Sequence, residues 1–298
     1  MPILDKGVWR TDINQLDEID HFPTQIVPEK DRYHFYYSYG CPFAHRANLV
    51  LHYLGLNHVI SSSGLAPEML ENGWTFNEVF KDDLFDSRHL YEIYTRAKAD
   101  YSGRASLPVL WDKKVNTIAS HNSAELAFHL ATQWQDFAQH SAELVSPELH
   151  DDILAMNEWL NSQITMKVYQ VGLANSQVKY EHQLAKLFQN LTALDERLSE
   201  NRYLFGNQIT LSDFFLFPTL IRFEAVYADL YKTNLKPLSA FENLYRYMVE
   251  LYQHPRIQAT VDVPHTKRFY YYSQPALNPT RLVPVGPQLA WLDNSKGE

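Results

Sequence analysis

The sequence predicts a two-domain protein in which an α/β domain is followed by an all-helical domain. Three observations support this prediction. Residues 33–61 read as a strand, a helix and a second strand, and residues 107–134 read as a hairpin followed by a helix. After Pro147 the apolar residues recur at helical spacing. The 298 residues are enough for two ordinary domains that each bury a core.

The composition is that of a folded protein with little affinity for polyanions. Hydrophobic residues make up 45% of the chain, charged residues make up 20%, and the net charge is -9. Because an acidic chain is a poor binder of phosphate backbones, we expect no nucleic acid among its partners. No apolar run is long enough to cross a bilayer, and residues 1–6 lack the pattern of a signal peptide. We therefore expect a cytoplasmic protein that does not bind membranes.

The first predicted elements form a strand–helix–strand unit. Residues 1–32 are polar and interrupted by prolines, and we expect them to form an N-terminal arm. Residues 33–37 are almost all aromatic and predict a strand. A helix is predicted over residues 42–54, and Gly55, the next residue, ends it. A second strand is predicted over residues 58–61.

A long insertion, residues 64–103, precedes the predicted hairpin. Residues 107–111 and 117–120 are its two strands, and a short polar turn joins them. A helix is predicted from Asn122 to about residue 134, because asparagine is a good N-cap. Together with the strand–helix–strand unit, these elements make a first domain of residues 33–134.

The second half of the chain predicts helices almost throughout. Apolar residues keep helical spacing in four segments, residues 148–168, 177–199, 211–230 and 241–253. We therefore expect an all-helical domain over residues 147–262. The tail, residues 263–298, is rich in proline, and we expect it to be irregular but ordered by its aromatic residues.

The single cysteine, Cys41, lies between the first predicted strand and the helix that opens with Pro42. Backbone N–H groups and the helix dipole at such a position favour a thiolate, and typically lower a cysteine pKa from ~8.5 to about 3.5–7.5. A lone cysteine is more often a buried core residue, but this context favours a nucleophile. With one cysteine there is no intrachain disulfide and no zinc site built on several thiolates, so a resolving thiol must come from outside. We expect no metal.

A second feature of the first domain is the proline that precedes its hairpin. Leu107-Pro108 stands where thioredoxin-like domains carry a cis-proline, whose cis bond would turn the Leu107 backbone toward the thiol. Taken alone, a trans proline at the start of an edge strand would be the simpler interpretation.

These features belong to an ordered set of motifs that resembles the xi-class glutathione transferases, the glutathionyl-hydroquinone reductases. The motifs are YGCPFAHR at 39–46, ENGWTF at 71–76, YSGR at 101–104, VLWDKK at 109–114, RYLFGNQ at 202–208, NPT at 278–280 and VGP at 285–287. Each is weak to moderately specific alone, but the ordered set is highly specific. The resemblance implies an α/β thioredoxin-like N-terminal domain, an all-α glutathione-transferase C-terminal domain and a homodimer.

The resemblance also implies a reaction that needs one cysteine. A thiolate attacks the glutathione sulfur of a glutathionyl-hydroquinone, the hydroquinone leaves, and a second glutathione resolves the mixed disulfide as glutathione disulfide. Cys41 would be the nucleophile. Glutathione is then a co-substrate, and small aromatic glutathione conjugates are the partners.

Five further positions match the family's glutathione contacts. They are Trp74, Arg104, the Leu107 backbone, Asn122 and Ser123. Glutathione carries two carboxylates, and an arginine can form charge-assisted hydrogen bonds with one of them. A helix N-terminus at Ser123 can receive the γ-glutamyl carboxylate. Without the family pattern, a surface arginine and a plain helix cap would explain these residues equally well.

Three tyrosines match the family's active-site tyrosines. They are Tyr169 in VYQVG, Tyr227 in RFEAVY and Tyr270 in KRFY. The resemblance implies that Tyr169 donates a proton to the leaving ring carbon, and that Tyr227 and Tyr270 form hydrogen bonds near the thiolate. Since the chain has 19 tyrosines, only the surrounding sequence distinguishes these three from core residues.

The chain departs from the family pattern at three positions. The family usually has Trp at Phe43, Glu at Asn122 and Lys at Gln170. The change at Asn122 removes a carboxylate that would meet the γ-glutamyl ammonium. Two other functions therefore remain in view: an omega-like thioltransferase or dehydroascorbate reductase, which needs the cysteine but not the tyrosines, and a non-catalytic ligand-binding protein.

Overall fold

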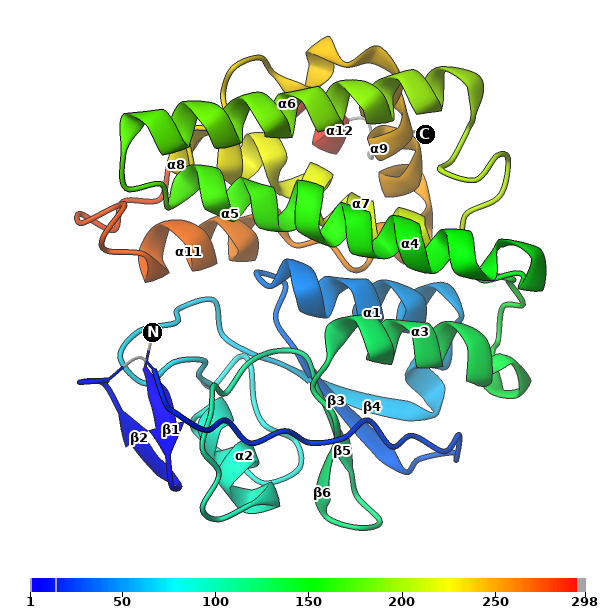
Figure 1. The fold of residues 1–298 in the computed structure, drawn as a ribbon. Coiled ribbons are helices and arrows are strands. Elements are labelled where there is room, and N and C mark those ends of the chain that lie inside the picture. Colours follow the sequence, from blue (N-terminus) through cyan, green and yellow to red (C-terminus); the bar gives the residue numbers. More distant parts are fainter. Residues whose placement is uncertain (1, 14, 294–298) are drawn as a thin grey trace. The chain divides into compact units, whose positions relative to one another are not determined.

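The computed structural model describes residues 2–13 and 15–293, which divide into two compact units. The first unit takes in the chain up to Ser141 together with Pro264–Ser273. The second takes in Ala142–Val263 and the chain from Gln274 onward. Each unit is described by itself below, with the element labels of Figure 1.

The first unit is built on a four-stranded mixed sheet in the order β4-β3-β5-β6. Its strands are β3 (Tyr33–Tyr37), β4 (Ile60–Gly64), β5 (Val109–Asp112) and β6 (Thr117–Ser120). β4 runs parallel to β3, with Tyr33 opposite Ile60, whereas β5 runs antiparallel to β3, with Tyr36 opposite Val109. The predicted strands of the α/β domain are all present, within a few residues of their expected bounds.

Two helices pack side by side against this sheet, α1 (Pro42–Tyr53) and α3 (Ser123–Gln133) (Figure 1). α1 is the crossover between the parallel strands, and its residues Leu49 and Val50 are fully buried. A third helix, α2 (Leu90–Ala97), lies within the long insertion. It is amphipathic, and Ile93 and Tyr94 are on its buried face. The insertion therefore contributes both a helix and core residues to the first unit.

The N-terminal arm begins with a hairpin of two short strands, β1 (Ile3–Asp5) and β2 (Val8–Arg10). Leu4 and Gly103 exchange two backbone hydrogen bonds of 2.9 Å, which tie the hairpin to the end of the insertion. Leu4 is fully buried. The polar composition of the arm did not indicate this hairpin, although its own pairing is local, with Ile3 opposite Arg10. Its attachment to Gly103, about a hundred residues away in the chain, could not be read from the arm.

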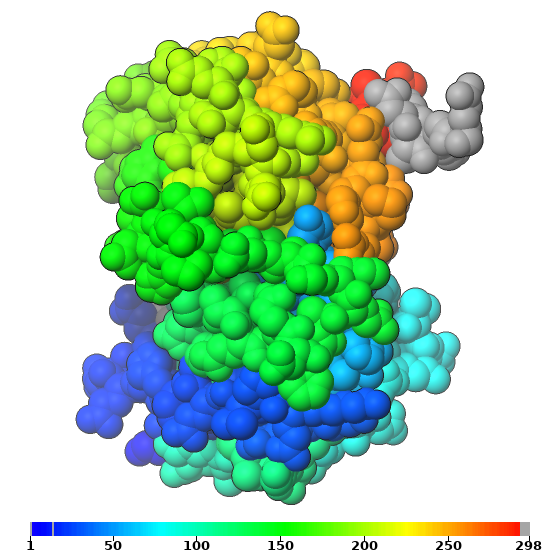
Figure 2. Space-filling model, turned by 90° about the vertical axis from the view of Figure 1, so that its right-hand side faces the viewer, coloured from blue at the N-terminus to red at the C-terminus, as the bar shows by residue number. Residues whose placement is uncertain are grey.

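Further along, the arm follows the edge strand of the sheet. The Gln25 N–H donates to the Ala119 carbonyl at 2.9 Å, and the Thr24 and Ser120 hydroxyls lie 3.0 Å apart. Figure 2 shows this part of the arm as a blue band beside the green of the α3 region. Covering the edge strand satisfies backbone groups that would otherwise be free to pair with another chain.

The second unit is helical throughout its regular structure. Its helices are α4 (His150–Leu160), α5 (Met166–Gly172), α6 (Gln177–Glu200), α7 (Leu211–Arg222), α8 (Ala228–Leu230), α9 (Glu242–Gln253), α10 (Pro255–Gln258) and α12 (Ala290–Asp293). Short 3₁₀ turns complete the two units, at Leu56–His58, Gln135–Phe137, Pro147–Leu149 and Leu238–Ala240. Every residue of α7 is buried, and α4 and α9 pack against it. Within the described residues, no helix is both long and apolar enough to cross a membrane.

Two π-helical segments interrupt the predicted long helices of the second unit. Asn161–Thr165 joins α4 to α5, and Phe223–Tyr227 joins α7 to α8. The hydroxyls of Thr165 and Thr219 lie 2.8 Å apart in the buried space between the two helix pairs. Segments of this kind occur often at functional sites, because they change the direction of side chains within a helix.

The tail differs from the expectation of an irregular segment. Val263–Ser273 forms helix α11, and Pro264–Ser273 belongs to the first unit. The prolines explain the difference: Pro264 lies in the first turn, where its missing N–H is not needed, and the next proline, Pro275, comes only after the helix has ended. Buried aromatic residues such as Phe269 and Tyr270 hold the helix in place.

Candidate active site

Cys41 caps helix α1, as its sequence context predicts. Its Sγ accepts a hydrogen bond from the Ala44 N–H at 3.4 Å, and its own N–H donates to the Ser38 carbonyl at 3.0 Å. Pro42 is the first residue of the helix. The side chain is 6% exposed. The sulfur therefore lies on the positive end of a buried helix, which favours the thiolate form.

The Leu107–Pro108 segment meets the cysteine as predicted. The peptide bond between these residues is cis. The Leu107 carbonyl oxygen lies 3.8 Å from Cys41 Sγ, and both residues are buried. Two segments that are far apart in the sequence thus come together at the thiol.

Helix α11 packs on the turn that carries the cysteine. The Thr266 hydroxyl donates to the Tyr39 carbonyl at 3.0 Å. The Phe269 ring lies against Gly40 and also stacks on Trp74, with centroids 4.7 Å apart at 10°. Trp74, one of the predicted glutathione contacts, is thereby linked to the cysteine turn through one aromatic ring.

Tyr270 lies on this same helix, next to Phe269. The two rings meet edge to face, with centroids 4.8 Å apart. Tyr270 is fully buried. Of the three predicted tyrosines, it is the one whose helix belongs to the unit of Cys41.

The start of α3 carries the predicted pair Asn122 and Ser123. Asn122 Oδ1 accepts the N–H groups of Ala124 and Glu125 at 3.0 and 3.3 Å, so its carbonyl oxygen serves as the helix cap. Its Nδ2 donates to Glu125 Oε1 at 2.9 Å. A carboxylate therefore stands beside Asn122 after all. Glu125 was missed from the sequence, although an N-cap followed three residues later by Glu is a recognisable pattern.

Arg104 lies in the loop that leads to Leu107. Its side chain is exposed, and its backbone carbonyl lies 3.5 Å from the Tyr101 hydroxyl. An exposed guanidinium on an anchored backbone is suited to a bidentate contact with a ligand carboxylate.

Tyr169 and Tyr227 lie in the second unit, where they form one aromatic cluster. Tyr169 is on α5, and Tyr227 is the last residue of a π-helical segment. Their ring centroids are 6.3 Å apart. Tyr227 is fully buried and Tyr169 half-buried. The structure thus brings together two of the three tyrosines that the sequence singled out.

A fourth tyrosine, Tyr231, completes this cluster and was not predicted. Its ring stacks on Tyr227 at 5.6 Å and 3°, and lies 5.4 Å from the ring of Tyr169. Its hydroxyl exchanges hydrogen bonds with the Gln274 amide at 2.8 and 3.1 Å, and burial raises the pKa of Tyr231. A Cβ at Gly172 would lie 2.3 Å from the Tyr231 ring, so glycine is needed there. One indication of this residue was present in the sequence: it follows Tyr227 by four positions, a spacing that places two side chains on the same face of a helix.

Gln170, a departure from the family pattern, is bonded to a lysine one turn earlier. Lys167 Nζ donates to Gln170 Oε1 at 2.8 Å and to Gln183 Oε1 at 3.0 Å. Burial lowers the pKa of Lys167. The cation at this part of α5 is therefore held by two amide oxygens.

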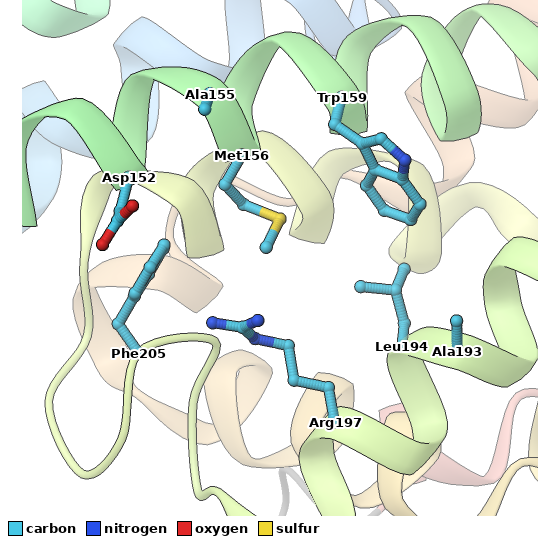
Figure 3. A pocket seen from close by; sticks show the side chains of 8 residues that line it. All are labelled: Asp152, Ala155, Met156, Trp159, Ala193, Leu194, Arg197 and Phe205. Carbon is cyan, nitrogen blue, oxygen red and sulfur yellow. The ribbon is translucent and has the colours of Figure 1, made fainter.

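The second unit also has a surface hollow of about 630 Å³ between α4 and α6 (Figure 3). Met156, Trp159, Arg197 and Phe205 are among its lining residues. Arg197 Nε donates to the Leu204 carbonyl at 2.7 Å, and the guanidinium lies over the Phe205 ring. None of the predicted catalytic or glutathione-binding residues lines this hollow.

Comparison with protein families gives two matches. The family described as "Glutathione S-transferase, N-terminal domain" matches residues 40–133, and "Glutathione S-transferase, C-terminal domain" matches residues 177–249. The first match contains Cys41 and the predicted glutathione contacts, and the second contains Tyr227.

Individual proteins are similar over most of their length. The glutathionyl-hydroquinone reductase YqjG of Escherichia coli is 39% identical over 90% of this chain and 82% of its own. Its glutathione-bound structure superimposes with a TM-score of 0.88, over 97% of this chain and 96% of that one. The glutathionyl-hydroquinone reductase PcpF of Sphingobium chlorophenolicum is 36% identical over 87% of this chain and 84% of its own. A xi-class glutathione transferase from Natrialba magadii, 33% identical, gives a TM-score of 0.92 over 98% and 95%.

Proposed function

The chain belongs to the xi-class glutathione transferases, the family of the glutathionyl-hydroquinone reductases, and we propose that Cys41 carries out the family's reaction in it. The reaction is the glutathione-dependent removal of a glutathionyl group from a glutathionyl-hydroquinone. One observation carries the proposal. The only thiol of the chain lies at the N-terminus of a helix, where it accepts the Ala44 N–H and lies beside the Leu107 carbonyl.

In the first step, the Cys41 thiolate attacks the sulfur of the conjugate. A bond forms between Cys41 Sγ and the glutathione sulfur, and the bond from that sulfur to the ring carbon breaks. The ring carbon takes the electron pair of the broken bond and one proton, so the free hydroquinone leaves and Cys41 carries a glutathionyl disulfide.

In the second step, a glutathione thiolate attacks the glutathionyl sulfur of this mixed disulfide. Glutathione disulfide leaves and the Cys41 thiolate is regenerated. Over the cycle, one glutathione thiol and the glutathionyl sulfur of the conjugate become a disulfide, and the carbon–sulfur bond is reduced to a carbon–hydrogen bond. No second protein cysteine is required, in agreement with the cysteine content.

We assign the proton donor to Tyr169, as the family pattern implies. A carbon leaving group needs a proton at the moment of departure, whereas a thiolate leaving group does not. Tyr227 and Tyr270 are assigned to hydrogen bonds that stabilise the thiolate. For Tyr270, which lies in the same unit as Cys41, burial supports this role, since hydrogen bonds are stronger where water is excluded.

Glutathione binding is assigned to the first unit. Arg104 holds one carboxylate, the N-terminus of α3 at Ser123 holds the γ-glutamyl carboxylate, and the Leu107 backbone pairs with the peptide part. Trp74 supplies an aromatic wall, and its stack on Phe269 supports that role. We propose that Asn122 takes part through the carboxylate of Glu125, to which its amide is bonded. A cytoplasmic homodimer is proposed on the family resemblance.

The experiment that tests this function is turnover of a glutathionyl-hydroquinone by the purified protein, with and without glutathione. We expect release of hydroquinone and one glutathione disulfide per cycle. Cys41→Ser is the matched control, because it changes one atom of the nucleophile. Turnover by Cys41→Ser at the rate of the unmodified protein would exclude Cys41 from the reaction.

A further inference from the structure

A chain of hydrogen bonds runs from helix α11 to the backbone of the cysteine turn. His265 Nε2 lies 2.9 Å from the Ser38 hydroxyl oxygen. The same oxygen accepts the Gly40 N–H at 3.2 Å, and the Ser38 carbonyl accepts the Cys41 N–H at 3.0 Å. His265 is 5% exposed and Ser38 1% exposed. One buried serine thus holds two successive amides, and its side chain is bonded to a histidine from the other end of the chain.

This arrangement controls where the sulfur points. The Cys41 amide and the Gly40 amide fix the last peptide units before helix α1, and Sγ then reaches the Ala44 N–H at 3.4 Å. A serine hydroxyl has one proton and two lone pairs, so its rotamer depends on its partners. Without a partner on α11, the Ser38 side chain would lose the bond that orients it toward the Gly40 N–H.

The imidazole ring of His265 is itself held in one orientation. Its ring meets Tyr39 at 5.5 Å and 71°, and meets Phe80 at 5.1 Å and 79°. Two edge-to-face contacts on a buried ring leave little freedom for rotation. The position of Nε2, and with it the Ser38 hydroxyl, is therefore set by packing.

Helix α11 has other attachments that do not involve the cysteine turn. Arg268 Nε donates to Glu68 Oε1 at 2.7 Å. The Met69 N–H donates to the Ser273 hydroxyl at 2.9 Å. Loss of the bond between His265 and Ser38 therefore leaves the helix anchored, and its effect can be separated from a general loosening of α11.

We propose that His265 is a positioning residue for Cys41, acting through the Ser38 hydroxyl on the amides of the cysteine turn. The inference rests on the proposed role of Cys41 as the nucleophile. Helix α11, near the C-terminal end of the chain, would then contribute to the reactivity of the Cys41 thiol. His265 touches neither substrate nor sulfur in this role.

The test compares two substitutions that differ by one methylene. His265→Gln places an amide nitrogen near the position of Nε2, within reach of Ser38, whereas His265→Asn places the same amide short of it. The measurement is the alkylation rate of Cys41 as a function of pH, which needs no substrate. We expect the Asn variant to titrate at a higher pH and to form the mixed disulfide about ten- to a hundredfold more slowly. The Gln variant should recover most of both properties.

Arg268→Ala is the matched control on the same helix. It removes the bond to Glu68, so it should lower the midpoint of thermal unfolding while leaving the alkylation profile unchanged. An alkylation profile in His265→Asn equal to that of the unmodified protein would overturn the proposal. A change of the same size in Arg268→Ala would also overturn it, because the effect would then belong to α11 as a whole.

A further variant removes the other partner of the hydrogen bond between His265 and Ser38. Ser38→Ala removes the hydroxyl and should shift the alkylation profile in the direction of His265→Asn, and the double variant should be no worse than the single ones. Additive effects would mean that the two residues act independently, which contradicts the proposal even if His265→Asn folds poorly. Failure of the proposed function would show differently, as absence of hydroquinone release by the unmodified protein while the alkylation comparison still holds.

Discussion

The ring of Phe269 lies directly on the α-carbon of Gly40. A β-carbon at Gly40 would be 2.5 Å from Phe269 Cγ and 2.6 Å from Cδ1, distances that non-bonded carbons do not adopt. The ring has little room to withdraw, because it also stacks on Trp74 and meets the Tyr270 ring edge to face. The residue before the cysteine is therefore glycine for a steric reason that comes from helix α11.

This contact predicts that Gly40→Ala displaces either the ring or the cysteine turn. Overpacking of a buried site typically costs about 1–3 kcal/mol, so we expect a lower midpoint of urea unfolding and slower turnover. Phe269→Ala removes Cγ and Cδ1, the two nearest atoms, and leaves only Cβ at 2.7 Å, so the penalty of Gly40→Ala should be smaller in that background. An equal penalty in both backgrounds would show that the ring is not the obstacle.

Tyr169→Phe should separate the two kinds of leaving group. Release of hydroquinone requires a proton on carbon, and a general acid typically contributes 10²–10⁴-fold. Reduction of a glutathione disulfide needs no such proton, so its rate should change little. Both rates are measured on the same protein preparation. Tyr180→Phe, which removes a hydroxyl of α6 that donates to the Lys232 carbonyl at 2.9 Å, is the control for loss of a hydroxyl outside the aromatic cluster. If Tyr169→Phe slows both reactions equally, Tyr169 is not the acid.

The hydrogen bond between Asn122 and Glu125 places a carboxylate beside the position where the family usually has Glu. It therefore bears on the glutathione affinity expected of variants at both positions. Glu125→Gln should weaken glutathione binding, because it removes the carboxylate nearest to the helix start. An exposed ion pair contributes about 0–1 kcal/mol, which corresponds to at most about a fivefold change in affinity. The effect should appear in KM for glutathione rather than in kcat, since the ammonium is bound equally in the ground and transition states.

Asn122→Glu should tighten glutathione binding, with a larger gain in the Glu125→Gln background, where no second carboxylate repels it. Titration of glutathione into the three variants measures both effects. Unchanged affinity in all three would mean that the γ-glutamyl ammonium does not lie at this end of α3.

The buried histidine of strand β3 predicts a pH dependence of stability. His34 Nδ1 lies 2.8 Å from the Ser61 hydroxyl and Nε2 lies 2.9 Å from that of Ser63, and burial lowers the pKa of His34 to about 4. In the unfolded chain the pKa is about 6.5. Between these values the unfolded state binds more protons, so stability is lost as the pH falls from 6.5 to 4, by up to about 3 kcal/mol.

His34→Gln should therefore flatten the dependence of the urea midpoint on pH over this range. Replacement of exposed His182 by Gln is the matched control and should leave the slope unchanged. A slope in His34→Gln equal to that of the unmodified protein would show that this histidine does not contribute to acid unfolding.

Much of the first unit could be predicted because its signals are local. The aromatic strand β3, the start of α1 at Cys41-Pro42 and the cap at Asn122 are each encoded within a few residues, and all three lie where the sequence predicts them. The cis bond before Pro108 was expected from the resemblance to thioredoxin-like domains, whereas its place before a strand, taken alone, favoured a trans bond.

The remaining features depend on partners that are distant in the sequence. The aromatic residues of the tail were expected to order it, but the helical form of α11 and its hydrogen bond to the cysteine turn depend on partners that no pattern within the tail reveals. The ring of Tyr231 was missed because one tyrosine among 19 carries little information until its stack on Tyr227 is known. The π-helical segments look like ordinary helix in the sequence, since they keep the same residue types and nearly the same spacing.

The most direct test of the account is the state of Cys41 after one turnover without free thiol. The protein is mixed with a stoichiometric amount of a glutathionyl-hydroquinone, and intact-protein mass spectrometry follows the adduct while chromatography follows the hydroquinone. The account predicts that one glutathionyl group appears on Cys41 for each hydroquinone released, and that added glutathione removes it as glutathione disulfide. Stoichiometric release of hydroquinone with Cys41 still unmodified would contradict it.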